Sequence, residues 1–323
     1  MKIRAGLNLP SGLAMPDEIS SYGAAADSLG FDSLWVVDRL LGRHPELNGS
    51  WPDAVATLAF LISVTRKIKL GTRVFVVPYR HPLFVAKMTA TLDYLSNGRF
   101  LFGVGVGWQP KEFESLGINL TERGKRTDES LEIVKKLWRG ESTSFHGSYF
   151  DLDNAQIDPL PSTPSGPQIW YGGGSIPQKA LQKNPTLGPR DPRPVLKRIA
   201  KWCDGWMPRS SAPNDMVQQD LDIIKEYAKE FGRNADEIEV ASADYIHVYE
   251  EGDEQKAEEL VKRATSLDFK TAKQEYMIGT VDEVRHRLES KYGGEKSMWS
   301  YTVINTFDPS IGQIELIKEK LLC

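Results

Sequence analysis

Short runs rich in β-branched and aromatic residues alternate along the chain with longer stretches of helical periodicity. The predicted strands are IRAGLNL, SLWVV, IKLGTRVFVV, RFLFGVGV, QIWYGG, CDGWMP, IEVASADYIHV and SYTVINTF. The predicted helices span about 16–29, 53–65, 83–96, 122–138, 194–202, 214–231, 254–266, 280–291 and 310–322. Strands joined by helices pair in parallel, and strands that are apolar on both faces suit a sheet that is covered on both sides. The alternation therefore predicts an α/β fold with eight parallel strands.

Two architectures fit this alternation, a closed (β/α)8 TIM barrel and an open doubly wound sheet. The open sheet would need a G-x-G-x-x-G phosphate loop between its first strand and first helix. The segment GVGVGW, residues 103–108, has a different spacing and lies on the predicted fourth strand. A length of 323 residues is usual for one barrel. We therefore predict a single barrel domain over 1–323, with excursions at about 140–167 and 176–194.

The two excursions differ in composition. The first is predicted to be a hairpin around His146 and Gly147, followed by a proline-rich segment. The second is predicted to be a loop rich in proline and basic residues. Both would add to the barrel without changing its strand order.

Composition excludes several classes of protein. Forty basic and 44 acidic residues give a net charge of −4, which argues against nucleic acid as a partner. Cys203 and Cys323 are the only cysteines, too few for a disulfide framework, and no two histidines are spaced as metal ligands. No apolar stretch has the length of a membrane span or of a signal core. We expect a cytoplasmic protein with no metal site and no membrane partner.

The glycines at 103, 105 and 107 leave one face of the fourth strand without side chains. Glycine inside an element costs roughly 0.5–1 kcal/mol relative to alanine, so something must occupy this face. Two hypotheses remain open. The glycines either relieve crowding inside the barrel, or they let a flat ligand lie on the backbone near the carboxyl end of the strand.

Several ordered motifs resemble one known family. They are SLWVVDRL, the segment from LGTRVFVVPYRHPLF to GRFLFGVGVGWQPKEF, ERGKRTDESLEIVKKLW, SFHGSYFDL, QIWYGGG and WCDGW. The sequence is similar to the bacterial luciferase-like flavin- and deazaflavin-dependent oxidoreductases, and most similar to the branch that uses coenzyme F420. The resemblance covers about residues 1–210 closely.

The resemblance implies a small-molecule oxidoreductase. In the first hypothesis, a hydride passes between F420 and an unidentified organic substrate. In the alternative, the protein is an FMN-dependent monooxygenase that uses O2 and reduced flavin. A separate reductase would supply the reduced flavin. A cofactor-binding protein without catalysis is the non-enzymatic alternative. The resemblance also implies a homodimer that associates through barrel helices.

The resemblance assigns cofactor contacts to three strand ends. The bond between Arg73 and Val74 matches a non-prolyl cis peptide behind the cofactor ring. The fourth-strand segment approaches the ring, and amides at the end of the fifth strand hold the phosphate, for which converging glycine N–H groups are suited. The residues at these two strand ends are Gly105, Val106, Gly107, Tyr171, Gly172, Gly173 and Gly174.

Further candidates surround these segments. Asp38 could accept a hydrogen bond from a ring N–H, or could pair with Arg39 or Arg43. Arg39 and Arg80 are candidate binders of an anionic group, and Trp108 either roofs the substrate pocket or packs in the core. The related sugar-phosphate dehydrogenases have a catalytic histidine directly after this aspartate. Because Arg39 stands there, we do not expect that activity.

The segment between 179 and 198, which overlaps the second excursion, carries six basic residues and one acid, Asp191. The basic residues are Lys179, Lys183, Arg190, Arg193, Lys197 and Arg198. FMN ends at its phosphate, whereas F420 continues into an acidic glutamate tail, which this segment could bind. A solvated surface loop is the other interpretation.

Overall fold

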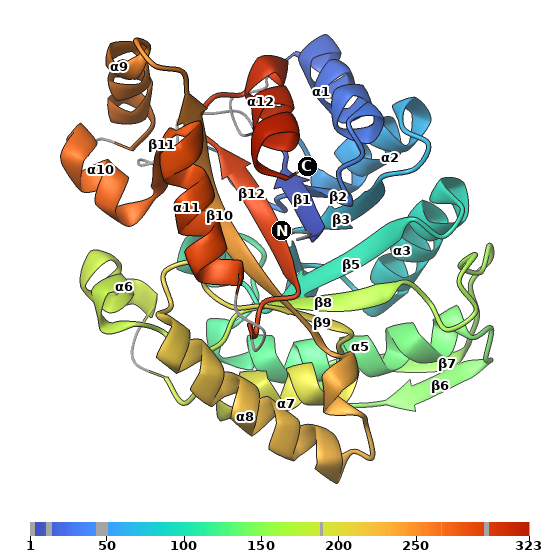
Figure 1. Cartoon of the computed structure of the whole chain (residues 1–323). Coiled ribbons are helices and arrows are strands. Elements are labelled where there is room, and N and C mark those ends of the chain that lie inside the picture. Colours follow the sequence, from blue (N-terminus) through green and yellow to red (C-terminus); the bar gives the residue numbers. More distant parts are fainter. Residues whose placement is uncertain are drawn as a thin grey trace.

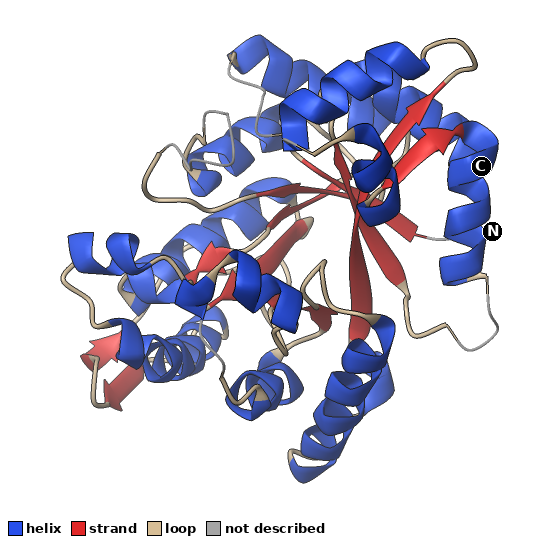
Figure 2. Cartoon of the chain, turned by 90° about the vertical axis from the view of Figure 1, so that its left-hand side faces the viewer, coloured by secondary structure: helices blue, strands red, loops and turns tan. Residues whose placement is uncertain are grey.

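A closed parallel barrel forms the centre of the protein, and helices surround it (Figures 1 and 2). The computed structural model describes residues 4–10, 15–42, 51–187, 190–265, 267–293 and 297–322. Around the barrel the strands are β1 (Arg4–Asn8), β2 (Ser33–Val36), β3 (Lys69–Thr72), β5 (Phe100–Gly105), β8 (Gln168–Gly172), β9 (Gly205–Met207), β10 (Glu239–Tyr249) and β12 (Tyr301–Thr306). The pairings of β12 with β1 and of β9 with β10 close the ring. The predicted (β/α)8 barrel is confirmed.

The predicted helices all form, with boundaries within about two residues of those expected. They are α1 (Pro16–Ser28), α2 (Ala54–Val64), α3 (Pro82–Ser96), α5 (Arg123–Trp138), α7 (Arg193–Trp202), α8 (Asn214–Glu230), α9 (Glu254–Thr265), α11 (Val281–Tyr292) and α12 (Ile311–Leu321). Local sequence explains where several begin. Asp53 accepts a hydrogen bond from the Ala56 N–H, and Thr280 forms a capping box with Glu283.

Four short elements were not predicted. They are α4 (Pro110–Ser115), α6 (Gln178–Lys183), α10 (Phe269–Glu275) and β11 (Met277–Thr280). The helices among them have six or seven residues, which is too few to establish a helical period. β11 pairs with the far end of β10. It therefore extends the sheet beyond the barrel ring.

The predicted third strand is divided into two. It consists of β3 and β4 (Phe75–Val76), both of which pair with β5. The Arg73–Val74 peptide bond between them is cis, as the resemblance implies. These two residues therefore lie at the mouth of the barrel, between the ends of β2 and β5.

The first excursion contains the predicted hairpin, formed by β6 (Thr143–His146) and β7 (Asp151–Ala155). It lies outside the barrel, beyond α5 (Figures 1 and 2). The prediction for the second excursion needs correction, because its described part is not simply a loop. It contains α6 and a 3-10 turn over Pro185–Leu187, and α7 begins at Arg193.

Large aromatic side chains fill the barrel interior and lie over glycines of neighbouring strands. Trp35 is directly opposite Gly71 in the register of β2 and β3, and Trp170 is opposite Gly205. The Trp35 and Trp170 rings meet edge to face, with their centroids 5.6 Å apart. A Cβ at Gly71 would lie 2.5 Å from the Trp35 ring, so glycine is required there by packing. The interior is thus a packed core beneath the barrel mouth.

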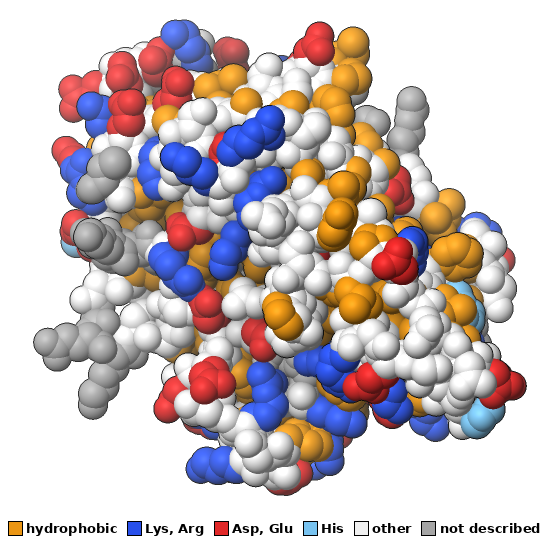
Figure 3. Space-filling model, turned by 90° about the vertical axis from the view of Figure 1, so that its right-hand side faces the viewer, with side chains coloured by type: hydrophobic (Ala, Val, Ile, Leu, Met, Phe, Trp, Pro, Cys, Tyr) orange, Lys and Arg blue, Asp and Glu red, His pale blue; other side chains and the backbone are white. Residues whose placement is uncertain are grey.

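The face of the molecule that Figure 3 shows carries mixed charged, polar and apolar side chains. Among the described residues, no helix is both long enough and apolar enough to cross a bilayer. Within the same part of the chain, no cluster of three or more His, Cys, Asp or Glu side chains has the arrangement of a metal site.

Candidate active site

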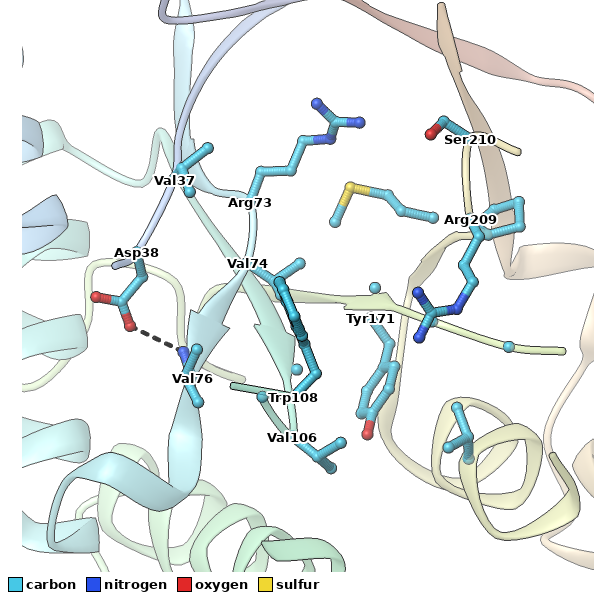
Figure 4. Close-up of a pocket in the computed structure, with 18 of the residues that line it drawn as sticks. Val37, Asp38, Arg73, Val74, Val76, Val106, Trp108, Tyr171, Arg209 and Ser210 are labelled. Atoms are coloured by element: carbon cyan, nitrogen blue, oxygen red, sulfur yellow. Dashed lines mark hydrogen bonds between the residues drawn. The ribbon is translucent and has the colours of Figure 1, made fainter. Parts of the chain in front are cut away.

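A cavity of about 590 Å³ opens at the carboxyl end of the barrel (Figure 4). Barrel enzymes place their active sites at this end, and the volume is in the range of small-molecule and cofactor sites. Most of the residues predicted as contacts line it. They are Asp38, Arg39, Arg73, Val74, Gly105, Val106, Gly107, Trp108, Tyr171, Gly172, Gly173 and Gly174.

The three glycines after Phe102 are required for three different reasons. A Cβ at Gly103 would overlap the backbone carbonyl oxygen of Thr72, so this glycine relieves crowding between β5 and β3. A Cβ at Gly105 would lie 2.6 Å from Cγ2 of Val74. Gly107 has a φ of +74°, which favours glycine. Packing accounts for Gly103 and Gly105 and backbone conformation for Gly107, which favours the hypothesis that the glycines relieve crowding.

The Val74 side chain fills the space left by Gly105 on β5 and Gly172 at the end of β8. Its Cγ1 atom lies 2.6 Å from the position of a Cβ at Gly172, and its Cγ2 atom is equally close to that of Gly105. The bare face of β5 is therefore covered by Val74 rather than empty. A flat ligand in the cavity would contact an apolar wall that Val74 and Val106 form, and Figure 4 shows both side chains in the cavity lining together with Trp108.

Asp38 is held by Arg80 and by the backbone of β4. Its Oδ2 atom accepts hydrogen bonds from the Val76 N–H at 2.9 Å and from Nη1 of Arg80 at 2.7 Å. Its Oδ1 atom accepts a third bond from Nη2 of Arg80 at 2.8 Å. Arg39 does not pair with it, and Arg43 lies outside the described residues.

The expectation that Arg80 binds an anionic substrate needs correction. Arg80 does not line the cavity, and its guanidinium lies 4.2 Å from the centroid of the Phe75 ring while it binds Asp38. Burial opposes its charge, but the Asp38 carboxylate outweighs that effect and raises the pKa of Arg80. Arg80 is therefore a positioning residue for Asp38.

Glu112 on α4 is a positioning residue that the sequence analysis missed. Its Oε1 atom accepts hydrogen bonds from the N–H groups of Leu40 and Leu41 at 3.1 and 3.0 Å. Its Oε2 atom accepts one from the Tyr79 hydroxyl. Burial and the Glu112 carboxylate raise the pKa of Tyr79, which keeps the hydroxyl protonated as a donor. Glu112 thus fixes the segment that follows Arg39.

The glycines after β8 are only partly available to an anion. The Gly173 N–H donates to the Met207 carbonyl at 3.0 Å, so the expectation that all these amides hold a phosphate needs correction. Gly174 has a φ of +141°, and within the described residues its N–H has no hydrogen-bond acceptor. The neighbouring Ser175 donates to Asp220 through both its N–H and its hydroxyl.

Arginine dominates the charge of the cavity lining. Five arginines line it, namely Arg39, Arg73, Arg123, Arg190 and Arg209. The two acids in the lining are Asp38 and Asp191, and each is paired with an arginine outside the lining. Burial lowers the pKa of Arg209, and the positive charge of Arg190 lowers it further. The charged guanidinium of Arg209 would therefore be stabilised by a negatively charged group beside it. The cavity is therefore suited to an anionic ligand.

Unpartnered polar atoms support the same conclusion. Among the described residues, several buried side-chain atoms of the lining have no hydrogen-bond partner, which is costly unless a ligand supplies one. They are Nε of Arg39, Arg123 and Arg209, Oδ1 of Asn8 and Nε1 of Trp51. The apolar wall, the arginines and these atoms together fit a flat aromatic group that carries a phosphate.

The basic segment between 179 and 198 is mostly neutralised. Four of its six basic residues pair with acids, in the bridges Lys179–Glu275, Arg193–Asp191, Lys197–Glu230 and Arg198–Asp128. The Lys183 side chain lies outside the described residues. Arg190 lines the cavity, whereas the segment as a whole does not present a row of unpaired cations. This favours the solvated-loop interpretation for most of it.

Comparison with known proteins places the chain among flavin- and deazaflavin-linked enzymes. A family model described as luciferase-like monooxygenase matches residues 2–183. An F420-dependent glucose-6-phosphate dehydrogenase from Amycolatopsis mediterranei is 33% identical over 162 residues, 49% of this chain and 48% of that protein. The enzyme of the same name from Microbacterium testaceum is 27% identical over 238 residues, which cover 70% of this chain and 68% of that protein. The match thus spans about half the length of the first relative.

Several solved structures match over the whole chain. One of them is a monooxygenase from Streptomyces bottropensis, with a TM-score of 0.79 and 25% identity, covering 100% of this chain and 99% of that one. The names of the two sequence relatives and of this structure give different activities, dehydrogenase and monooxygenase.

Proposed function

Because the chain belongs to the luciferase-like monooxygenase family, we propose that it is an oxidoreductase that transfers a hydride between coenzyme F420 and an organic substrate. The observation that carries the proposal is the cavity, in which an apolar wall beside the Arg73–Val74 bond faces a positively charged lining. The names of the F420-dependent relatives support this cofactor. When bound, the deazaflavin supplies the hydride chemistry, and the protein supplies binding, orientation and exclusion of water.

The lining residues divide between the parts of such a cofactor. Val74 and Val106 would contact the ring. A carboxylate has about four acceptor positions, of which Asp38 uses three, so one remains for a ring N–H. Arg209 and the Gly174 N–H would hold the phosphate, and Arg190 would lie toward a tail.

An FMN-dependent monooxygenase that uses O2 is the second candidate, with a separate reductase as its partner. Two observations favour it, namely the similar monooxygenase structure and the ion pairs that neutralise most of the basic segment. Arg39 stands where related sugar-phosphate dehydrogenases have a histidine. We therefore propose a substrate other than a sugar phosphate for the F420 reaction.

A homodimer through the barrel helices is part of the proposal. Exposed apolar side chains lie on α2 and α3, namely Phe60, Phe84, Tyr94 and Leu95. Their exposure supports association of two copies on this face. Sedimentation velocity of the purified protein measures the oligomeric state directly. A monomer at micromolar concentration would contradict the proposed homodimer.

Parallel titrations with F420 and FMN test the cofactor, followed by the absorption spectrum of each. We expect F420 to bind more tightly, and its affinity to fall as salt rises, because exposed charges are screened over roughly 10 Å at 0.1 M. Arg209→Gln should weaken F420 about tenfold, and Arg190→Gln should flatten the salt dependence. Arg139→Gln, at the far end of α5, is the matched control.

Tighter binding of FMN than of F420 would contradict the F420 proposal and favour the FMN-dependent monooxygenase. Oxidation of the reduced cofactor during turnover with a panel of organic substrates would distinguish an enzyme from a cofactor-binding protein without catalysis.

A further inference from the structure

The cavity mouth carries arginines on opposite sides. In the ring of strands, three strands separate β2 from β9 in either direction. Arg39 follows β2 and Arg209 follows β9, so the two arginines lie across the mouth from each other. Figure 4 shows the same separation, with Val37 and Asp38 on one side and Arg209 with Ser210 on the other.

The Arg39 side has its own binding features. The Arg39 guanidinium lies over the Trp51 ring, 5.7 Å from the ring centroid, and the Arg39 residue is half-buried. Within the described part of the chain it forms no ion pair, and its Nε atom is buried without a hydrogen-bond partner. Nε1 of Trp51 is likewise buried and has no hydrogen-bond partner among the described residues. The nearby Asp38 is already paired with Arg80, so it does not neutralise this side.

The phosphate is the anionic group nearest the ring in both cofactors. FMN has this phosphate alone, and in F420 the further acidic groups follow it. A phosphate held beside Arg209 therefore does not supply the counter-charge of Arg39, which lies across the mouth. We propose that Arg39 and Trp51 form a second anion site, which binds an anionic group of the substrate. The substrate is then an organic anion, such as a carboxylate or a phosphate ester other than a sugar phosphate. This inference rests on the proposed function.

Inorganic phosphate is the probe for this site. We expect calorimetric titration at constant ionic strength to detect two phosphate sites in the cofactor-free protein, and one after loading with F420 or FMN. In the loaded protein, Arg39→Gln should weaken phosphate binding about tenfold or more, because a charge-assisted hydrogen bond is lost. Arg39→Lys should restore part of that loss.

The reciprocal variant and a control separate the two sites. Arg209→Gln should weaken the cofactor and leave the phosphate affinity of the loaded protein unchanged. Arg139→Gln, about 24 Å along α5 from Arg123, should change neither.

Three results would overturn the second site. They are a loaded protein that binds no phosphate, an Arg39→Gln variant that binds it as tightly as the parent, and an Arg39→Gln variant whose main defect is in cofactor affinity. The last result would assign Arg39 to the cofactor instead. If neither cofactor binds, the proposed function fails, but the separate effects of the Arg39 and Arg209 variants on the cofactor-free protein still decide whether two anion sites exist.

Discussion

Gly103→Ala is expected to lower the free energy of unfolding by about 4 kcal/mol or more, a large loss for one methyl group. The added Cβ would overlap the carbonyl oxygen of Thr72 in the neighbouring strand. That oxygen belongs to the backbone, and the Thr72 hydroxyl also donates to the Gly103 carbonyl at 2.7 Å, so the two strands cannot separate without losing this bond. Urea denaturation measures the change.

Two other glycines are matched controls. The Cβ of Gly105→Ala meets the Val74 side chain, which can move, so the expected loss is about 1–3 kcal/mol. Gly312 lies in α12 with open space around it, and Gly312→Ala should raise stability by up to about 1 kcal/mol. A Gly103→Ala protein as stable as Gly105→Ala would show that β5 and β3 are not packed in this way.

Asp38→Ala is expected to cost about 3–5 kcal/mol of stability and to abolish cofactor binding, because removal of one partner leaves a buried charge without compensation. The Asp38 side chain is 2% exposed and that of Arg80 is 19% exposed. After the change, Arg80 keeps only Asp53 at 3.6 Å, and the Val76 N–H loses its acceptor.

A double-mutant cycle measures this coupling. Arg80→Leu should also be strongly destabilising, and the Asp38→Leu/Arg80→Leu double variant should lose less than the sum of the two single losses, because it leaves no unpaired charge. Urea denaturation measures the free energy of unfolding of the two single variants and of the double variant. Additive losses would show that the pair contributes no coupling energy, and the positioning role of Arg80 would then be wrong.

The elements that repeat a period were predictable from the sequence. The barrel and its nine main helices follow from runs long enough to show their periodicity, and the resemblance indicated the Arg73–Val74 cis bond. The short elements α4, α6 and α10 were missed because one or two turns show no period. Most lining residues lie at the end of a strand or just after it, which is why strand ends identified Asp38 and Gly105 correctly as part of the cavity.

Partners distant in the sequence could not be predicted. The Asp38–Arg80 pair joins residues 42 positions apart, and Glu112 reaches back to Leu40 over 72 positions. The basic segment was interpreted without its counter-ions, because Glu275, Glu230 and Asp128 come from other helices. Arg209 follows β9 and Asn305 lies at the end of β12, so the strand-end rule could have identified both.

A crystal structure of the protein with oxidised F420 is the most direct test of the cofactor site. We expect the deazaflavin ring to lie in the barrel-mouth cavity against Val74 and Val106, with its phosphate beside Gly174 and Arg209 and with Arg39 on the opposite side free for the substrate. A ring bound outside this cavity, or a phosphate held by Arg39, would contradict this assignment.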